Sequence, residues 1–300
     1  MEHKPVLLNE VMEVLNPKAG EIFVDGTIDG GGHAKAILEK ISPGGKLIGI
    51  DWDKNAIEKF ELKITNHQST IILVNDNFKN MKEILKNENI VKADGVLLDL
   101  GFSSEQLDPP AGGAGRGFSF LRDEPLLMTY SDRTRPAYRV LSEESESNLA
   151  KVIKDFGEER FAGRIARTIK KNLPVATSKK LAEVVASAVP KNYEHGRINP
   201  ATRTFQALRI FVNQELENLR TFLESVPQIL NPGGRLAVIS FHSLEDRIVK
   251  NEFRQWKQNG FVEILTKKPI TPSPEEIQNN PRSRSAKLRG LKVAQEKQIQ

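Results

Sequence analysis

Residues 21–53 carry the pattern that most limits what this chain can fold into: EIFVDGTIDGGGHAKAILEKISPGGKLIGIDWD. An apolar strand, a glycine-rich turn that opens a helix, and a second strand ending in Asp51 follow one another. This order predicts a β-α-β unit with parallel strands. Glycines let a backbone approach a ligand at a helix N-terminus, and an acid about 20 residues further on can accept hydrogen bonds from a ribose. The segment therefore predicts the first half of a nucleotide-type cofactor site.

The charges of this turn indicate which cofactor it suits. Residues 30–35 read GGGHAK, so Lys35 stands where a dinucleotide-binding turn has its third glycine. Asp25 and Asp29 flank the turn, and two carboxylates repel a pyrophosphate but attract an ammonium and a sulfonium. S-adenosylmethionine therefore fits better than NAD or FAD. A strand-to-helix turn without a ligand is the alternative interpretation.

The alternation of strands and helices continues beyond this unit and then changes. Strands are predicted at 21–25, 46–51, 70–75 and 94–100, helices alone from about 142 to 225, and strands again at 235–241 and 261–266. We predict an α/β fold in which a doubly wound, mostly parallel sheet is interrupted by an all-helical insert. The sheet domain would take residues 1–118 and 217–300, and the helical domain residues 119–216.

Residues 199–223 predict the clearest helix of the chain. Asn199 can cap it, Pro200 suits its first turn, and apolar residues recur at steps of three and four. The apolar stripe consists of Phe205, Leu208, Val212, Leu216, Leu219 and Leu223. A polar line beside it is formed by Arg203, Gln206, Arg209 and Asn213. We interpret this line either as a structural row or as an RNA contact made by Arg203 and Arg209.

The excess positive charge lies near the C-terminal end of the sequence. The formal net charge is +5, and residues 267–297, with eight Lys or Arg and three Glu, carry a net charge of the same size. Cations gain affinity for nucleic acid by releasing its counterions. The sequence therefore predicts a basic tail that contacts RNA, with a solvated terminus as the alternative. The candidate RNA contacts in this tail are Arg282, Arg284, Lys287 and Arg289.

Composition excludes several kinds of chemistry. The chain has no cysteine, which excludes disulfides, thiolate nucleophiles and iron-sulfur clusters. Its five histidines show no metal-ligand spacing, so we expect no metal site. Its apolar runs are too short to span a bilayer, and residues 1–10 lack the apolar core of a signal peptide. We therefore expect a cytoplasmic protein with no membrane association.

Acidic residues end three of the predicted strands: Asp25, Asp51 and Asp99. In open α/β sheets, ligands bind outside the carboxyl ends of the strands. We therefore expect the three carboxylates and the 101–108 loop to line one crevice. Each acid alone is more often a helix cap or a solvated strand end, but three at the ends of predicted parallel strands favour a site.

Eight motifs together resemble the RsmH (MraW) family, over residues 3 to about 289. They are HKPVLL at 3–8, GGH at 31–33, LDLG at 98–101, RGFSF at 116–120, PATR at 200–203, FQALRI at 205–210, ISFHSLEDRIVK at 239–250 and NPRSRSAKLR at 280–289. The resemblance implies a class I (Rossmann-like) methyltransferase sheet with an inserted helical domain. It also implies methyl transfer from S-adenosylmethionine to the exocyclic N4 of a cytidine in the decoding region of bacterial small-subunit rRNA.

The resemblance further implies which residues contact the cofactor: Gly31, Gly32, His33, Asp51, Phe78, Asp99 and Gln106. Asp99 and Ser103 are the candidate catalytic residues, because a hydrogen-bond acceptor should localise the lone pair of the cytosine amine. The family turn normally has Gly where this chain has Asp29.

The implied partner is small-subunit rRNA or the assembled small subunit, and the oligomeric state stays open, with a homodimer as one form. Two other classes of function are alternatives at this point. One is a ribosome-assembly factor that binds the cofactor without turnover, and the other is a nicotinamide oxidoreductase.

Overall fold

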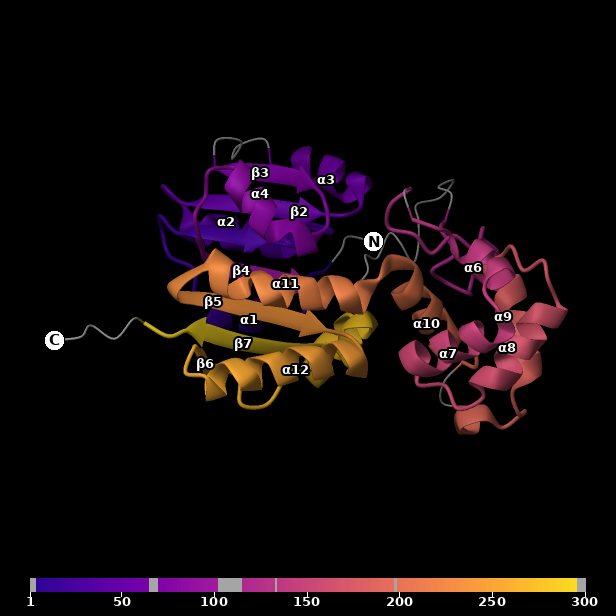
Figure 1. Ribbon diagram of the computed structural model, residues 1–300. Coiled ribbons are helices and arrows are strands. Elements are labelled where there is room, and N and C mark those ends of the chain that lie inside the picture. Colours follow the sequence, from indigo (N-terminus) through magenta and orange to yellow (C-terminus); the bar gives the residue numbers. More distant parts are fainter. Residues whose placement is uncertain (1–3, 65–69, 102–114, 133, 197–198, 296–300) are drawn as a thin grey trace. The chain divides into compact units, whose positions relative to one another are not determined.

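Within the described residues, seven strands form one sheet in the computed structural model (Figure 1). The structure describes residues 4–64, 70–101, 115–132, 134–196 and 199–295. The strand order is β3-β2-β1-β4-β5-β7-β6. Pairs from β3 to β5 are parallel, and β7 is antiparallel to both β5 and β6. The strands are β1 (Ile22–Asp25), β2 (Lys46–Asp51), β3 (Ile71–Asn75), β4 (Ala93–Asp99), β5 (Leu230–Ser240), β6 (Val262–Ile264) and β7 (Lys287–Val293).

Helices cover both faces of this sheet. Buried side chains of α1 (Leu8–Leu15), α2 (Gly32–Ile41) and α3 (Lys54–Glu61) share one apolar cluster with the sheet. Those of α4 (Met81–Asn87), α11 (Glu215–Ile229) and α12 (Ser243–Gln258) share the other. Smaller elements of the same unit are η1 (Phe78–Asn80), α13 (Pro274–Asn279) and η3 (Pro281–Ser285). The predicted doubly wound, mostly parallel sheet is confirmed.

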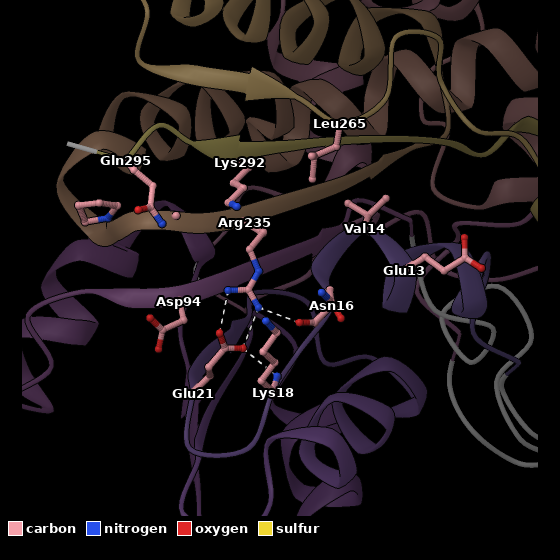
Figure 2. Close-up of a pocket in the computed structure, with 12 residues that line it drawn as sticks. Glu13, Val14, Asn16, Lys18, Glu21, Asp94, Arg235, Leu265, Lys292 and Gln295 are labelled. Carbon is pink, nitrogen blue, oxygen red and sulfur yellow. Dashed lines mark hydrogen bonds and ion pairs between the residues drawn. The ribbon is translucent and has the colours of Figure 1, made fainter. Parts of the chain in front are cut away.

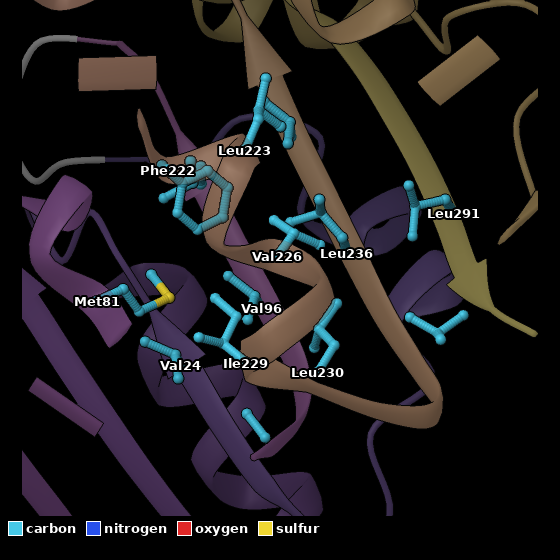
Figure 3. Close-up of a cluster of buried hydrophobic side chains, with 14 of the residues drawn as sticks. Val24, Met81, Val96, Phe222, Leu223, Val226, Ile229, Leu230, Leu236 and Leu291 are labelled. Carbon is cyan, nitrogen blue, oxygen red and sulfur yellow. The ribbon is translucent and has the colours of Figure 1, made fainter. Parts of the chain in front are cut away.

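Alternation along the strands decides which cluster each side chain joins. Phe23 packs with α1 to α3, whereas its neighbour Val24 packs with α4, α11 and α12. Figure 3 shows the second cluster, in which Phe222 and Val226 of α11 lie over Val96 of β4. Burial of one such side chain contributes about 1.5–3 kcal/mol, so the two clusters hold the strand ends in fixed register.

The chain divides into two compact units, one of Met1–Gly101 with Leu216–Gln300 and one of Phe102–Glu215. The sequence placed the first boundary at 118/119, later than the structure does. Phe118 explains the difference, because it is buried in the apolar cluster of the helical unit and stacks on Tyr130 at 5.3 Å between ring centroids. The second boundary, expected at 216/217, lies one residue earlier.

The helical unit has its own apolar core. Its elements are α6 (Ala137–Glu143), α7 (Glu146–Gly157), α8 (Ala162–Lys171), α9 (Ser178–Ala188), η2 (Tyr193–Gly196) and α10 (Thr202–Asn213). Helices α7 and α10 approach closely at Gly157, where a β carbon would lie 2.6 Å from the carbonyl oxygen of Arg203. No larger residue fits there without moving the backbone.

The single helix predicted at 199–223 is wrong, because the structure has two helices there. Gln214 adopts a left-handed backbone conformation, φ 53°, and ends α10 before α11 begins. Phe205 and Leu208 pack in the core of the helical unit, whereas Leu219 and Leu223 pack against the sheet. One apolar stripe therefore serves two separate cores.

The prediction of a basic tail is also wrong, because most of this segment is folded. Residues 287–293 form β7, which lies inside the sheet between β5 and β6. None of the helices in the described ranges combines the length and the apolar composition needed to cross a membrane.

Candidate active site

Three carboxylates lie at the carboxyl ends of neighbouring parallel strands. Asp25 ends β1, Asp51 ends β2 and Asp99 ends β4. The strand order reverses between β1 and β4, so Asp25 and Asp99 stand on the two sides of the switch point at which open α/β sheets bind ligands. The structure therefore brings the three predicted acids to one edge of the sheet.

Hydrogen bonds from two backbone amides fix the carboxylate at the end of β2. The Oδ2 of Asp51 accepts from the amide of Asp29, and its Oδ1 accepts from the amide of Asp53, both at 2.8 Å. The left-handed φ of 44° at Asp29 is a conformation that glycine adopts without strain. The bond from the Asp29 amide to Asp51 therefore helps to hold the backbone in this conformation.

Thr27 is a site residue that the sequence reasoning missed. Its hydroxyl oxygen accepts from the amide of Asp99 at 2.7 Å, and its own amide donates to Oδ1 of Asp25 at 3.1 Å. It thereby joins the ends of β1 and β4. Its position two residues beyond the first strand was the only signal in the sequence.

Burial makes all three acids hard to ionise. Burial raises the pKa of Asp25 well above its usual value, and the charges of Asp99 and Asp51 add to the effect. Burial also raises the pKa of Asp51 to about 7, against the hydrogen bonds from Asp29 and Asp53. The pKa of Asp99 rises to about 7 through burial and through the charge of Asp29. A bound cation would reverse these shifts, because it favours the charged carboxylates.

Close packing explains why glycine stands at two of the predicted site positions. Gly31 caps α2 with φ 79°, and a β carbon on it would lie 2.1 Å from the ring of Phe60. A β carbon on Gly32 would lie 2.8 Å from the ring of Pro5. Both glycines therefore let the turn pack tightly, and this role is independent of any ligand.

His33 points one ring nitrogen at the backbone and the other at an acid. Its Nε2 lies 2.9 Å from the carbonyl oxygen of Val6, which can only accept, so this nitrogen carries a proton and donates. Its Nδ1 lies 3.7 Å from Oδ2 of Asp99. His33 therefore ties α2 to the segment before α1 and faces the acidic edge.

Phe78 follows β3 and lies near the same edge. Its ring packs edge-on against Phe222, with 6.0 Å between ring centroids, and its β carbon lies 3.3 Å from where Gly26 would carry one. Two further candidates, Ser103 and Gln106, lie outside the described residues. The structure thus brings together all the other predicted cofactor residues within one unit.

A cavity of about 450 Å³ lies at the opposite edge of the sheet (Figure 2). Arg235 of β5 lines it and donates to Oε1 and Oε2 of Glu21 at 2.9 and 2.7 Å. The same guanidinium donates to the carbonyl oxygen of Leu15 at 2.7 Å. These protein groups occupy the Arg235 donors, so we assign this ion pair a structural role and place the active site at the acidic edge.

The two candidate RNA contacts of α10 are both paired with acids. Arg203 lies 3.3 Å from Glu194. Arg209 is buried, 8% exposed, and its Nε and Nη2 donate to the two carboxylate oxygens of Glu215 at 2.9 and 3.0 Å. This geometry favours the structural row over an RNA contact at Arg209.

The four candidates of the C-terminal segment divide into two kinds. Arg289 donates to Asp246 at 2.6 Å with a largely buried side chain, and Lys287 lies 3.7 Å from the same carboxylate. Burial raises the pKa of Asp246, but the hydrogen bond and charge of Arg289 outweigh it and hold the pKa below its usual range. Arg282 and Arg284 are exposed on η3.

The acidic edge fits S-adenosylmethionine. Within the described ranges, Oδ2 of Asp25 and Oδ1 of Asp99 are buried and have no hydrogen-bond partner, a state that a ligand with donors and positive charge would relieve. Asp51 retains lone pairs on both oxygens for the hydroxyls of a ribose. Together, the fold and the site define a class I methyltransferase that uses S-adenosylmethionine.

Comparison with known proteins identifies the family. A family model described as the MraW methylase family matches residues 1–294. The chain belongs to this family. Relatives named "Ribosomal RNA small subunit methyltransferase H" include that of Syntrophus aciditrophicus, 45% identical, with 96% of each chain covered. That of Thermotoga neapolitana is 47% identical, with 98% of this chain and 97% of the relative covered.

These findings decide between the classes of function that the sequence left open. The family and its named relatives are methyltransferases, so the nicotinamide oxidoreductase is wrong. A cofactor-binding assembly factor without turnover is not favoured. The predicted cofactor, S-adenosylmethionine, is confirmed at the level of the family.

Proposed function

We propose that this protein transfers a methyl group from S-adenosylmethionine to the exocyclic N4 of a cytidine in the rRNA of the small ribosomal subunit. The observation that carries the proposal is similarity along nearly the whole chain to relatives named for small-subunit rRNA. The acidic edge supports it, because the groups needed to hold the cofactor lie together in this chain.

The reaction needs an acceptor more than it needs a strong base. The chemistry supplied by the bound cofactor is an electrophilic methyl group on a sulfonium. The lone pair of the cytosine amine is delocalised into the ring, so an acceptor must localise it and help remove a proton. Asp99 is the described residue best suited to this role, since its Oδ1 is buried and lacks a partner among the described residues. Ser103 remains a second candidate.

The absence of cysteine bears on the position that is methylated. Methylation of cytosine at C5 ordinarily proceeds through attack of a cysteine thiolate on the ring. This chain has no cysteine, so that covalent route is closed to it. N4 is open to direct displacement, which requires positioning of the amine rather than a nucleophile from the protein.

The RNA has to present its base singly, because a stacked base cannot reach the acids of a crevice. We assign this task to the helical insert, with the sheet unit holding the cofactor. The protein would work in the cytoplasm on small-subunit rRNA or on the assembled small subunit. A homodimer is an arrangement that sedimentation of the purified protein would test.

Nucleoside mass spectrometry tests the function directly. The purified protein is incubated with S-adenosylmethionine and with small subunits that lack the modification, and the rRNA is then digested to nucleosides. We expect one methyl group per subunit, on N4 of a cytidine. A methyl on C5, on a ribose oxygen or on no cytidine at all would contradict the proposal.

A further inference from the structure

The helical unit has a run of positive charge around α8, apart from the candidate RNA contacts of α10. Residues 160–180 contain seven Lys or Arg and no Asp or Glu. This run covers α8, the short loop after it and the start of α9 (Figure 1).

Packing turns the cations of α8 outward along one line. Ile165, Ala166 and Ile169 of α8 are fully buried in the core of the helical unit. Arg164, Arg167 and Lys171 are exposed on the other side, at helical steps of three and four, and Arg160 is exposed just before the helix. From Arg164 to Lys171 the line extends for about 10 Å along the axis, at 1.5 Å per residue.

The stability of the helices does not explain the cations at their N-terminal ends. Lys179 and Lys180 stand in the first turn of α9, and Arg164 in the first turn of α8, with no acid in either turn. Cations near a helix N-terminus oppose the helix dipole and therefore destabilise the helix. Lys170 and Lys171 differ from these cations, because both stand in the last turn of α8, where a positive charge favours the helix dipole. Lys170 also donates to the carbonyl oxygens of Leu141 and Ser142.

Few acids of the described residues compensate the exposed line. Arg167 pairs with Glu146 at 3.2 Å, with both side chains well exposed. An exposed pair of this kind contributes little to stability, so a phosphate can replace the carboxylate. No ion pair is described for Arg164 or Lys171 among the residues that the structure covers. The line is therefore a cationic surface that is largely uncompensated within the described chain.

We propose that Arg160, Arg164, Arg167 and Lys171, here called the α8 ridge, bind phosphates of the rRNA backbone. A row of cations along a helix matches the regular row of charges along an RNA strand, and such contacts position the nucleic acid without reading its sequence. The ridge would hold RNA that flanks the methylated cytidine. This inference rests on the proposed function for the identity of the RNA.

The test compares two variants with the same change of charge. The ridge variant replaces Arg160, Arg164, Arg167 and Lys171 by Gln. The control variant replaces four exposed cations of the sheet unit by Gln, namely Lys82, Lys86, Arg254 and Lys257. Methyl transfer to small subunits is measured over a range of salt concentrations, together with cofactor affinity by calorimetry.

We expect the ridge variant to raise KM for the small subunit by about tenfold or more at moderate salt. The slope of log affinity against log salt should fall by about three, since each lost phosphate contact removes about 0.7–0.9. The value of kcat at saturating subunit and the affinity for S-adenosylmethionine should match those of the parent. A double variant, Arg164→Gln with Lys171→Gln, should show about half the change in slope and guards against a folding defect in the larger variant.

Two outcomes would overturn the proposal that the α8 ridge binds rRNA. One is an unchanged KM and salt slope in the ridge variant, and the other is an equal rise in KM in the ridge and control variants. A parent protein that methylates no cytidine would instead contradict the proposed function. In that case, filter binding of small-subunit rRNA tests separately whether the ridge binds RNA. A salt-dependent loss of binding confined to the ridge variant supports it, and equal binding by parent and variant overturns it.

Discussion

The two units of this protein hold their clusters of charge in different surroundings. In the sheet unit, three acids are gathered at one edge, with Asp25 buried and Asp51 and Asp99 half-buried, and the last two have pKa values raised to about 7. In the helical unit, cations stand on the surface of α8. By sequence, residues 102–215 carry 18 Lys or Arg against 14 Asp or Glu, so they account for +4 of the net charge of +5.

This difference determines how each unit responds to its surroundings. A buried carboxylate interacts strongly over a few ångströms and changes its charge with pH. An exposed cation keeps its charge, and salt screens its attraction over about 8–10 Å at moderate ionic strength. Cofactor binding should therefore depend on pH and rRNA binding on salt. The predictions below test this separation, starting with the largest expected effect.

Asp99→Asn should reduce methyl transfer by about 10²- to 10⁴-fold, the range for loss of a positioned acid or base. The substitution keeps the shape of the side chain and removes its negative charge. Asp155→Asn, at an exposed position of α7, is the matched control and should leave the rate unchanged. Calorimetry on the Asp99 variant separates a role in cofactor binding from a role toward the amine, and a rate equal to that of the control would remove Asp99 from the active site.

Arg289→Ala should lower the free energy of unfolding by about 3 kcal/mol, because it leaves the largely buried Asp246 without its main partner. Urea unfolding measures this change. Replacing the exposed Arg282 and Arg284 by Ala should change stability by no more than about 0.5 kcal/mol. Equal stability of all these variants would show that Arg289 is not structural.

Asp51→Ala should weaken binding of S-adenosylmethionine by about 1.5–3 kcal/mol, as expected for hydrogen bonds to a charged group. Calorimetry provides the measurement, and circular dichroism checks that the fold survives. The ridge variant serves as a comparison, since its cofactor affinity should equal that of the parent. Unchanged affinity in the Asp51 variant would exclude this acid from the cofactor site.

Affinity for S-adenosylmethionine should increase as pH rises from 6 to 8. Asp51 and Asp99 have pKa values of about 7 without ligand, and the ionised forms bind a positively charged ligand better. Each group can contribute up to about tenfold per pH unit below its pKa. In the protein without ligand, stability changes with pH in the direction opposite to the change in cofactor affinity. Both pKa values lie above the usual 3.8, so between pH 4 and 7 the folded protein binds more protons than the unfolded chain. The free energy of unfolding should therefore fall as pH rises from 4 to 7.

Calorimetry in buffers of different ionisation enthalpy would detect the protons released when the cofactor binds. A dissociation constant that stays flat from pH 6 to 8 would show that these acids are already ionised in the free protein.

The features that the sequence predicted well were local ones. The first four strands and the acids at their ends follow from apolar runs and turn residues that lie side by side in the chain. The strand β7 was missed because Lys287, Arg289 and Lys292 suggested a solvated segment. In the structure, Leu288 packs on one face of the sheet and Leu291 and Val293 pack on the other, so β7 is covered on both faces.

Other features depend on contacts between distant or irregular parts of the chain. Thr27 meets the amide of Asp99 72 residues further on, and only the folded sheet brings them together. The break at Gln214 has no glycine or proline to mark it. The ion pair of Arg209 with Glu215 lies across this break at a spacing of six, which is not a helical neighbour spacing.

The place of β7 in the sheet has a consequence for the order in which the protein can be made. β7 pairs with β5 on one side and with β6 on the other, so β6 has no strand to join until residues 287–293 have been synthesised. The helical unit, by contrast, is contiguous in sequence and can fold as soon as it is translated. We expect a nascent chain to carry a finished helical unit while its sheet is still open, and to complete the sheet only once residues 287–293 have been synthesised.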